Sequence, residues 1–217
     1  MPKRVDHARR RDEIALVACQ VVARGGFSQA TVAHIARAAG YTTGMVAHYF
    51  ASKQEIILAA LRLILRRMDQ RLRRPAGAAG ADAGAELLAV LSEALPIDEP
   101  RRAECAFWTA FWGQLPADQK LTRLNAWVHR EYRKLFERCL REHWPDSRAW
   151  PPAVRAQVLR SLITFINGIT TGAVSSPGVW PAREQVRQLQ LHLDLLRGWA
   201  AGSNSGGIME KAAWISH

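Results

Sequence analysis

The sequence predicts an all-α fold of about nine helices. Three observations lead to this prediction. Apolar residues recur with the 3.6-residue period of a helix along most of the chain. No segment shows the polar–apolar alternation of a half-buried strand. Proline is absent between Pro2 and Pro75, so the first third of the chain can form unbroken helices. A chain of 217 residues, 48% of them hydrophobic, can bury a sizeable core in one large domain or two small ones.

Three short helices are expected at the start of the chain. The first runs from about residue 9 to 24 and ends at Gly25-Gly26, where glycine accepts a left-handed backbone. Thr31 can cap a second helix, which Gly40 stops. Thr42 can cap a third helix that extends through residues 49–50.

A long fourth helix is expected over about residues 53–73. Ser52 and Glu55 have the spacing of a capping box, which marks a helix N-terminus. Residues 75–81 form the clearest break in composition and predict a loop. Prolines and glycines then divide the rest into helices over about 83–95, 100–114, 119–143, 153–175 and 181–199.

The positive charge is concentrated in the first third of the chain. The formal net charge is +11, but residues 1–74 hold 14 basic and 5 acidic residues, whereas residues 75–217 hold 16 and 14. A basic module joined to a near-neutral one indicates DNA targeting coupled to a second role. Nonspecific DNA packaging would instead favour positive charge along the whole chain.

Several other classes of protein are disfavoured. The three cysteines lie far apart, and none has a histidine at a zinc-ligand spacing, so we expect no disulfide framework, no metal and a reducing cytoplasm. Residues 161–182 carry no formal charge, but their hydroxyl groups and Pro177-Gly178 indicate a buried helix and a loop rather than a membrane span. The sequence has no nucleophile elbow, HExxH or P-loop motif, so we expect neither an enzyme nor a bound cofactor.

Residues 32–51 fit the spacing of a helix-turn-helix unit. The fifth position, where two helices cross closely, is Ala36, and the ninth, where the turn is left-handed, is Gly40. The apolar positions are Ile35, Ala39 and Val46. The second helix of such a unit enters the major groove of DNA. The alternative is an ordinary hairpin of two helices.

The run TVAHIARAAG at 31–40, with YTTGMVAHYF at 41–50 and ASKQEIIL at 51–58, resembles the TetR family of bacterial repressors. The resemblance is strong over about residues 9–60. The His-Tyr-Phe motif at 48–50 and the Phe107-Trp108-x2-Phe111-Trp112 pattern are most similar to the choline-responsive branch of the family, which controls betaine biosynthesis. The resemblance implies a DNA-binding domain at 1–52, a connecting helix at 53–73, and a domain at 53–200 for ligand binding and dimerisation. The glycine- and serine-rich run at 202–207 indicates a flexible tail at 201–217.

The family implies a set of DNA contacts. Thr31 and Thr42 would hold phosphate groups at helix N-termini. The candidate contacts to base edges are Thr43, Gly44 and Ala47. The further candidate phosphate contacts are His48, Tyr49 and Lys53. Alternatively, His48 is an ordinary surface residue and Tyr49 packs into the domain. Because residues 42–50 carry no charge, we expect DNA shape and phosphate contacts to share in site selection. An N-terminal arm with Lys3, Arg4 and Arg9–Arg11 either reaches the DNA or stays solvated.

All eight tryptophans follow residue 107, and the i, i+4 pairs Phe107/Phe111 and Trp108/Trp112 make one helix aromatic over a broad arc. Such a helix either packs in the core or lines a ligand pocket. Aromatic faces can hold a quaternary ammonium by cation–π attraction. The candidate ligand-binding residues are Glu104, Trp108, Phe111, Trp112, Trp127 and Phe165. The alternative for Glu104 is a surface salt bridge.

The last two helices are expected to form a homodimer, as in the family. Gly168, Gly172 and Ala173 would permit close helix approach, and Leu189, Leu193 and Leu196 would add an apolar stripe. A dimer would place its recognition helices about 34–36 Å apart on palindromic double-stranded DNA. A small-molecule effector would shift helix 53–73 and release the DNA. The rival hypothesis is a helical small-molecule-binding protein, or an enzyme, with an incidental basic face.

Overall fold

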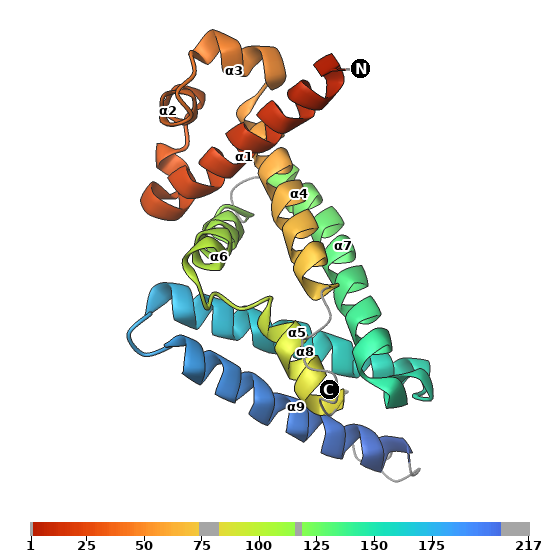
Figure 1. The fold of residues 1–217 in the computed structure, drawn as a ribbon. Helices are drawn as coiled ribbons and strands as arrows, with labels where there is room; N and C mark the ends of the chain where they lie inside the picture. The colour runs from red at the N-terminus through yellow and green to blue at the C-terminus, as the bar shows by residue number, and fades with distance from the viewer. Residues whose placement is uncertain (1, 74–82, 116–118, 205–217) are drawn as a thin grey trace. The chain divides into compact units, whose positions relative to one another are not determined.

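The computed structural model describes residues 2–73, 83–115 and 119–204, and these ranges contain nine α-helices and one 3-10 helix (Figure 1). The all-α prediction is confirmed. The helices are α1 (Pro2–Gln29), α2 (Val32–Ala38), α3 (Thr43–Tyr49), α4 (Lys53–Leu72), α5 (Ala83–Ser92), α6 (Glu99–Trp112), α7 (Gln119–His143), η2 (Pro145–Arg148), α8 (Pro152–Ser175) and α9 (Ala182–Asn204).

Helix α1 begins at Pro2, seven residues before the predicted start at residue 9. Lys3 and Arg4 of the expected N-terminal arm are therefore helical, as was expected only for Arg9–Arg11. Near its C-terminal end α1 is kinked at Gly26, whose φ of 72° lies in the left-handed region that glycine accepts without strain. The predicted break at Gly25-Gly26 is thus the site of this kink.

Capping residues fix the ends of the next helices as predicted. Thr31 and Thr42 both have extended backbones, and their hydroxyl oxygens accept hydrogen bonds of 3.1 Å from the amides of His34 and Met45. Gly40 has a φ of 72° at the turn between α2 and α3. These local signals alone are enough to place both helices.

The start of α4 differs slightly from the capping-box prediction. The Ser52 hydroxyl accepts a hydrogen bond from the Glu55 amide at 3.3 Å. The Glu55 carboxylate, however, accepts from the amide of Ala51 at 3.1 Å, one residue before its usual partner. Both bonds still satisfy amide groups at the helix N-terminus.

The later boundaries are close to those predicted, with three differences. Pro100 is the second residue of α6 rather than the first, because Asp98 caps the helix by accepting from the Arg101 amide at 2.9 Å. Residues 145–148 form the 3-10 helix η2 where a loop was expected. Helix α9 extends to Asn204, so the first residues of the predicted tail are helical, and residues 205–217 lie outside the described residues.

By its internal contacts the chain divides into two compact units. Unit 1 comprises Met1–Arg71 and Pro96–Tyr132, and unit 2 comprises Leu72–Leu95 and Arg133–His217. Unit 1 thus combines α1–α3 with α6, because α1 and α6 pack against each other. The functional boundary predicted after residue 52 is a different division and stays a prediction.

Each unit buries its own apolar side chains. In unit 1, Ile14, Ile35 and Phe107 are fully buried, and in unit 2, Phe136 and Leu162 are. Helix α8 is long and apolar enough to cross a membrane by length and composition alone, a test that a core helix also passes. Its buried residues include Leu162 and Ile166, and it packs against α9.

The three cysteines are free thiols and all are buried. Burial raises the pKa of the Cys19 thiol and that of the Cys139 thiol to about 12. Both thiols are therefore protonated near neutral pH.

Candidate nucleic-acid interface and aromatic cluster

Helices α2 and α3 form the predicted helix-turn-helix unit on one face of α1 (Figure 1). Ala36 is buried where α2 crosses its neighbours, and Val46 is the buried residue of α3. Small residues at the crossing and a left-handed Gly40 in the turn allow the two short helices to pack closely. The alternative of an ordinary helical hairpin does not account for this full pattern.

The predicted base-reading residues share an exposed face of α3. Thr43, Gly44 and Ala47 are all solvent-exposed. A Cβ atom added at Gly44 would meet only the Thr42 hydroxyl, at 4.0 Å, so packing within the chain does not require a glycine there. The absence of a side chain at Gly44 leaves room for another molecule to approach the backbone.

The predicted phosphate contacts surround this face. The Thr31 and Thr42 hydroxyl oxygens accept capping bonds, which leaves their O–H groups available as donors. His48 is exposed, whereas Tyr49 is half-buried and its ring lies 4.8 Å from that of His7. Lys53 donates to the carbonyl oxygen of Phe27 at 2.9 Å, which uses one of its three ammonium hydrogens.

Two arginines of the supposed arm are bonded inside unit 1. Arg10 donates to the carboxylate of Glu13 and to the hydroxyl of Tyr41, and Arg11 donates to the carbonyl oxygen of Tyr49. Sequence reasoning missed these bonds because the partners lie up to 38 residues apart. The apolar spacing of α1 gives no signal for them.

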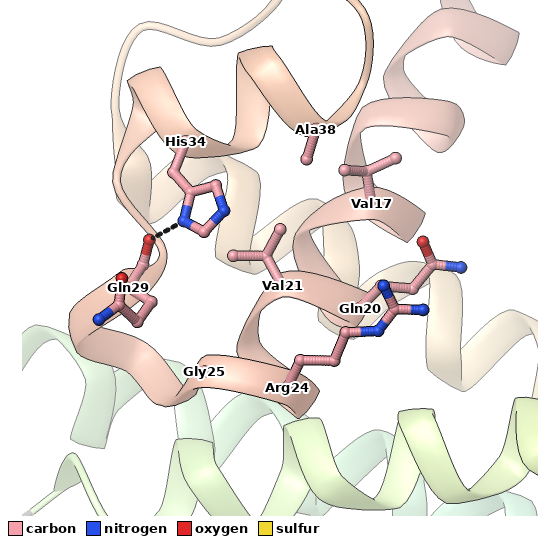
Figure 2. A pocket seen from close by; sticks show the side chains of 8 residues that line it. All are labelled: Val17, Gln20, Val21, Arg24, Gly25, Gln29, His34 and Ala38. Carbon is pink, nitrogen blue, oxygen red and sulfur yellow. Dashed lines mark hydrogen bonds between the residues drawn. The ribbon is translucent and has the colours of Figure 1, made fainter.

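A hollow of about 470 Å³ lies between α1 and α2 (Figure 2). Val17, Val21 and Ala38 form its apolar part, and its polar lining carries no acidic group. Figure 2 shows the His34 ring donating through Nδ1 to the carbonyl oxygen of Gln29, at 2.8 Å. None of the predicted DNA contacts lines this hollow.

The aromatic helix α6 is partly core. Phe107 and Phe111 are fully buried, and their ring centroids lie 5.8 and 6.4 Å from that of Phe27 at the end of α1. Phe111, predicted as a ligand contact, is thus packed between α1 and α6. This geometry matches the core-packing alternative that the sequence left open.

Trp108 and Trp112 form a second aromatic pair on α6. Their ring centroids are 6.1 Å apart at an interplanar angle of 36°. Trp108 is 6% exposed, and its indole N–H has no hydrogen-bond acceptor among the described residues. A buried donor without an acceptor costs free energy, on the order of 1–3 kcal/mol.

Glu104 lies one turn before Trp108 and is only 4% exposed. Its carboxylate is 2.7 Å from the Arg71 guanidinium and 3.5 Å from that of Arg67. The alternative of a surface salt bridge is therefore wrong, since helix packing buries this group between α4 and α6. Two arginines already balance its charge, so it offers little negative charge to a bound cation.

A cavity of about 510 Å³ beside Glu104 lies among α1, α4 and α6. Its charged lining residues are Arg24, Arg67, Arg102, Glu99 and Glu104, an excess of one positive charge. This balance does not suit a quaternary ammonium.

The remaining ligand candidates are separated from one another. Trp127 on α7 lies under the Arg62 guanidinium at 5.6 Å, in unit 1. Phe165 belongs to unit 2, where it stacks on His192 with the ring centroids 4.0 Å apart. Of the six predicted ligand residues, the structure brings Trp108, Phe111 and Trp112 into one cluster.

The predicted dimer stripe on α9 is wrong in its choice of leucines. Leu189, Leu193 and Leu196 are buried within the chain and cannot form a new interface. Leu191 and Leu195, which are 52% and 63% exposed, lie on the opposite side of the helix. The exposed side also carries leucines, at Leu191 and Leu195, among polar residues such as Gln188 and Asp194, and leucines on two sides of a helix weaken an argument from periodicity.

The small residues of α8 have two separate roles. A Cβ atom on Gly172 would lie 2.9 Å from the Trp180 indole, so this glycine serves packing within the chain. Gly168 is exposed and lines a groove of about 490 Å³ between α8 and α9, with Phe165 and His192. The exposed part of this face therefore combines the groove with Leu191 and Leu195.

Comparison with known proteins gives two family matches. Residues 14–60 match the model of bacterial regulatory proteins of the TetR family, and residues 83–198 match that of the C-terminal domain of BetI-type transcriptional repressors. The two matches together take in the helix-turn-helix and most of the remaining helices.

Curated relatives agree with this result. The chain is 32% identical to the HTH-type transcriptional regulator BetI of Stenotrophomonas maltophilia over 58% of its length and 64% of the relative's. It is 26% identical to BetI of Paraburkholderia xenovorans over 90% of this chain and 97% of that protein.

A similar solved structure is a transcriptional regulator from Saccharomonospora viridis in complex with choline. It is 19% identical in sequence, has a TM-score of 0.69, and the match covers 86% of this chain and 96% of that one. At this identity the similarity establishes the fold alone.

Proposed function

Because the chain belongs to the TetR family of bacterial transcriptional regulators and has a BetI-type C-terminal domain, we propose that it is a repressor that binds a palindromic operator as a homodimer and is released by a small molecule. The observation that carries the DNA-binding part is the exposed, uncharged face of α3, held in a helix-turn-helix unit. Such a helix enters the major groove. The cytoplasm, where the DNA is, is the corresponding location.

Operator selection uses the α3 face and phosphate contacts around it. Thr43 can donate to a base edge, Ala47 can contact a thymine methyl, and Gly44 permits close approach. Thr31, Thr42, His48, Tyr49 and Lys53 are the proposed phosphate contacts.

The dimer forms through the exposed face of α8 and α9. The occupant of this face is a second copy of the chain, because Leu191 and Leu195 expose large apolar side chains on the same helix that lines the groove with His192. A two-fold dimer would pair this face with itself and bury these side chains.

The effector is a small quaternary amine. The support is the BetI-type domain, the choline complex of the similar structure, and the Trp108/Trp112 pair of α6. Indole faces attract an ammonium group, and a hydroxyl oxygen on the ligand could accept the unpartnered Trp108 N–H. Binding that favours one of two dimer geometries would shift the population away from the DNA-bound one.

The experiment selects duplexes from a random library with the full chain, then measures affinity for the selected site by fluorescence anisotropy with and without choline. We expect a palindrome with half-sites one helical turn apart and weaker binding with choline. A selection that returns no palindrome would overturn the operator proposal.

The effector has its own control. Trp108→Leu should abolish the choline-induced thermal shift, whereas Trp150→Leu should retain it. Trp150 is a suitable control because it is buried against Trp144 in unit 2 and does not belong to the Trp108/Trp112 pair. No shift of the wild-type protein with choline or betaine aldehyde would exclude this class of effector.

A further inference from the structure

Helix α1 contacts both ends of the recognition helix through two adjacent arginines. We propose that Arg10 and Arg11 are positioning residues for DNA recognition: they hold the turn before α3 and the C-terminal end of α3, and so set sequence selectivity without binding DNA themselves. This inference rests on the proposed operator function.

Arg11 holds the C-terminal end of α3. Its guanidinium donates to the carbonyl oxygen of Tyr49, the last residue of the helix. The last carbonyl groups of a helix have no acceptor role inside it, and a cation there interacts favourably with the helix dipole. The same guanidinium lies 4.1 Å from the centroid of the buried Phe50 ring, so its position is fixed from two sides.

Arg10 holds the other end through Tyr41. Its guanidinium donates to the Tyr41 hydroxyl at 2.6 Å and to the Glu13 carboxylate at 3.0 Å, and the hydroxyl donates to the same carboxylate at 2.9 Å. Hydrogen bonding by Tyr41, with that of Arg10, lowers the pKa of the Glu13 carboxyl. Tyr41 directly precedes Thr42, the cap of α3, so this triad fixes the turn from α1.

These contacts matter because α3 has few others. It is seven residues long, too short to be stable alone, and Val46 is its buried residue. Its base-reading side chains are small and uncharged, so they distinguish bases only by short-range contacts. A small rotation of α3 would therefore cost more selectivity than it would in a helix that reads bases with long, flexible arginines.

The neighbouring Arg9 provides a matched control. It is exposed, and its ion-pair distances are 3.8 Å to Asp6 and 3.7 Å to Glu13, both within α1. Arg9→Ala removes the same charge from the same helix turn as Arg11→Ala but leaves the contacts to α3 in place.

The experiment compares operator and scrambled duplexes across salt concentrations, with the full-length dimer. For Arg11→Ala and Arg10→Ala we expect the ratio of operator to nonspecific affinity to fall roughly tenfold, the size of one mismatched base pair. The slope of log affinity against log salt should stay unchanged, because no phosphate contact is lost. Arg9→Ala should leave the ratio unchanged.

Two further variants separate geometry from charge and from misfolding. Tyr41→Phe loses no charge, so a fall in its selectivity would come from geometry alone. Because Tyr41 and Arg10 belong to one hydrogen-bonded triad, adding Tyr41→Phe to Arg10→Ala should lower the selectivity little further. Arg11→Lys keeps the charge but cannot reproduce the planar stacking on Phe50, so its ratio should also fall. Circular dichroism confirms that each variant is folded.

Three results would overturn the inference. The first is an equal loss of affinity for the operator and the scrambled duplex, with the salt slope reduced by about one. That result would identify Arg10 or Arg11 as phosphate contacts. An unchanged ratio in folded Arg11→Lys and Tyr41→Phe would show that the bonds do not set selectivity. A selectivity loss in Arg9→Ala equal to that in Arg11→Ala would show a general charge effect. A wild type without operator preference would instead reject the proposed function.

Discussion

The exposed face of α3 and the exposed face of α8–α9 are both solvent-exposed helix surfaces, yet they have opposite chemistry. On α3 the predicted base-reading residues Thr43, Gly44 and Ala47 are small and uncharged, and the exposed Met45 lies beside them. On α9 the exposed side chains of Leu191 and Leu195 are large and apolar. Apolar area gains free energy simply by leaving water, whereas a small polar face gains only from well-placed contacts.

The difference predicts how each surface depends on the rest of the molecule. The α9 face should bind through its own side chains and tolerate small displacements. The α3 face should depend on residues that hold or surround it, including Arg10, Arg11 and Lys53. The following predictions test this contrast, from the largest expected effect to the smallest.

The largest effect is expected for the double substitution Leu191→Glu with Leu195→Glu. In a two-fold dimer it would place four carboxylates where four leucines are buried. Burial of one leucine side chain stabilises the dimer by about 1.5–3 kcal/mol. We expect a monomer by light scattering and operator affinity reduced on the order of 100-fold or more. Val179→Glu is the control, since Val179 is 70% exposed but lies in the turn after α8. A double variant that stays dimeric would show that another surface forms the dimer.

The second prediction concerns Lys53→Ala. Loss of one phosphate contact should weaken operator and nonspecific binding alike and reduce the salt slope by about one. Tyr49→Phe should weaken binding to both duplexes by a smaller factor. It should leave the slope of log affinity against log salt unchanged, because it removes no charge. If neither variant changes affinity, the phosphate assignments for both residues are wrong. A thermal melt separates this effect from the lost Lys53–Phe27 bond.

The third prediction contrasts two neighbouring threonines. Thr42→Ala removes the cap of α3 and should cost about 1 kcal/mol of unfolding free energy, with a parallel loss of operator affinity. Thr43→Ala removes no cap, so it should leave the unfolding midpoint unchanged and alter the preferred base sequence. Chemical denaturation and repeated site selection measure the two effects. Equal loss of stability in both variants would contradict the separation of capping from base reading.

The smallest effect is expected at the α8–α9 groove. Burial lowers the pKa of His192, which stacks on Phe165 and lies near Arg160, the charged residue lining this groove. The pKa of His192 is thus lower in the folded chain than its ordinary value of about 6.5. The free energy of unfolding is therefore highest above that ordinary pKa, and it falls as the pH drops through the lowered pKa of the folded chain. A second copy of the chain seated on this groove would bury His192 further and so disfavour its protonated form. For this reason we expect the dimer to dissociate a few-fold more readily at about pH 5.5 than at 7.5.

His192→Gln is the control for this pH dependence. It should flatten the dependence when dissociation is followed by analytical ultracentrifugation. A dimer whose dissociation is equally pH-dependent in both proteins would locate the titrating group elsewhere.

Sequence reasoning worked best where a structure depends on neighbouring residues. Thr31, Thr42 and Gly40 fix α2 and α3 through local caps and a left-handed turn, and all three were predicted. The family matches then confirmed a DNA-binding regulator, which excludes the rival of an incidental basic face.

It failed where a side chain's role depends on a distant partner. The burial of Glu104 depends on Arg67 and Arg71 of another helix. Arg11 looked like part of a basic arm because its partner at Tyr49 is 38 residues away. The candidate ligand residues were chosen by type, and their type alone could not show that Phe111 packs against Phe27.

The buried cysteines have a practical consequence for testing the proposed change in dimer geometry. With pKa values of about 12, the Cys19 and Cys139 thiols hold almost no thiolate at neutral pH, and Cys105 is also buried. Maleimide and methanethiosulfonate reagents react with thiolates, so the native protein should be nearly inert to them. A single cysteine at an exposed position such as Lys120 would then carry a spin label alone, without removal of the native thiols. Labels placed in this way on each protomer would report interprobe distances by pulsed spectroscopy, with and without choline.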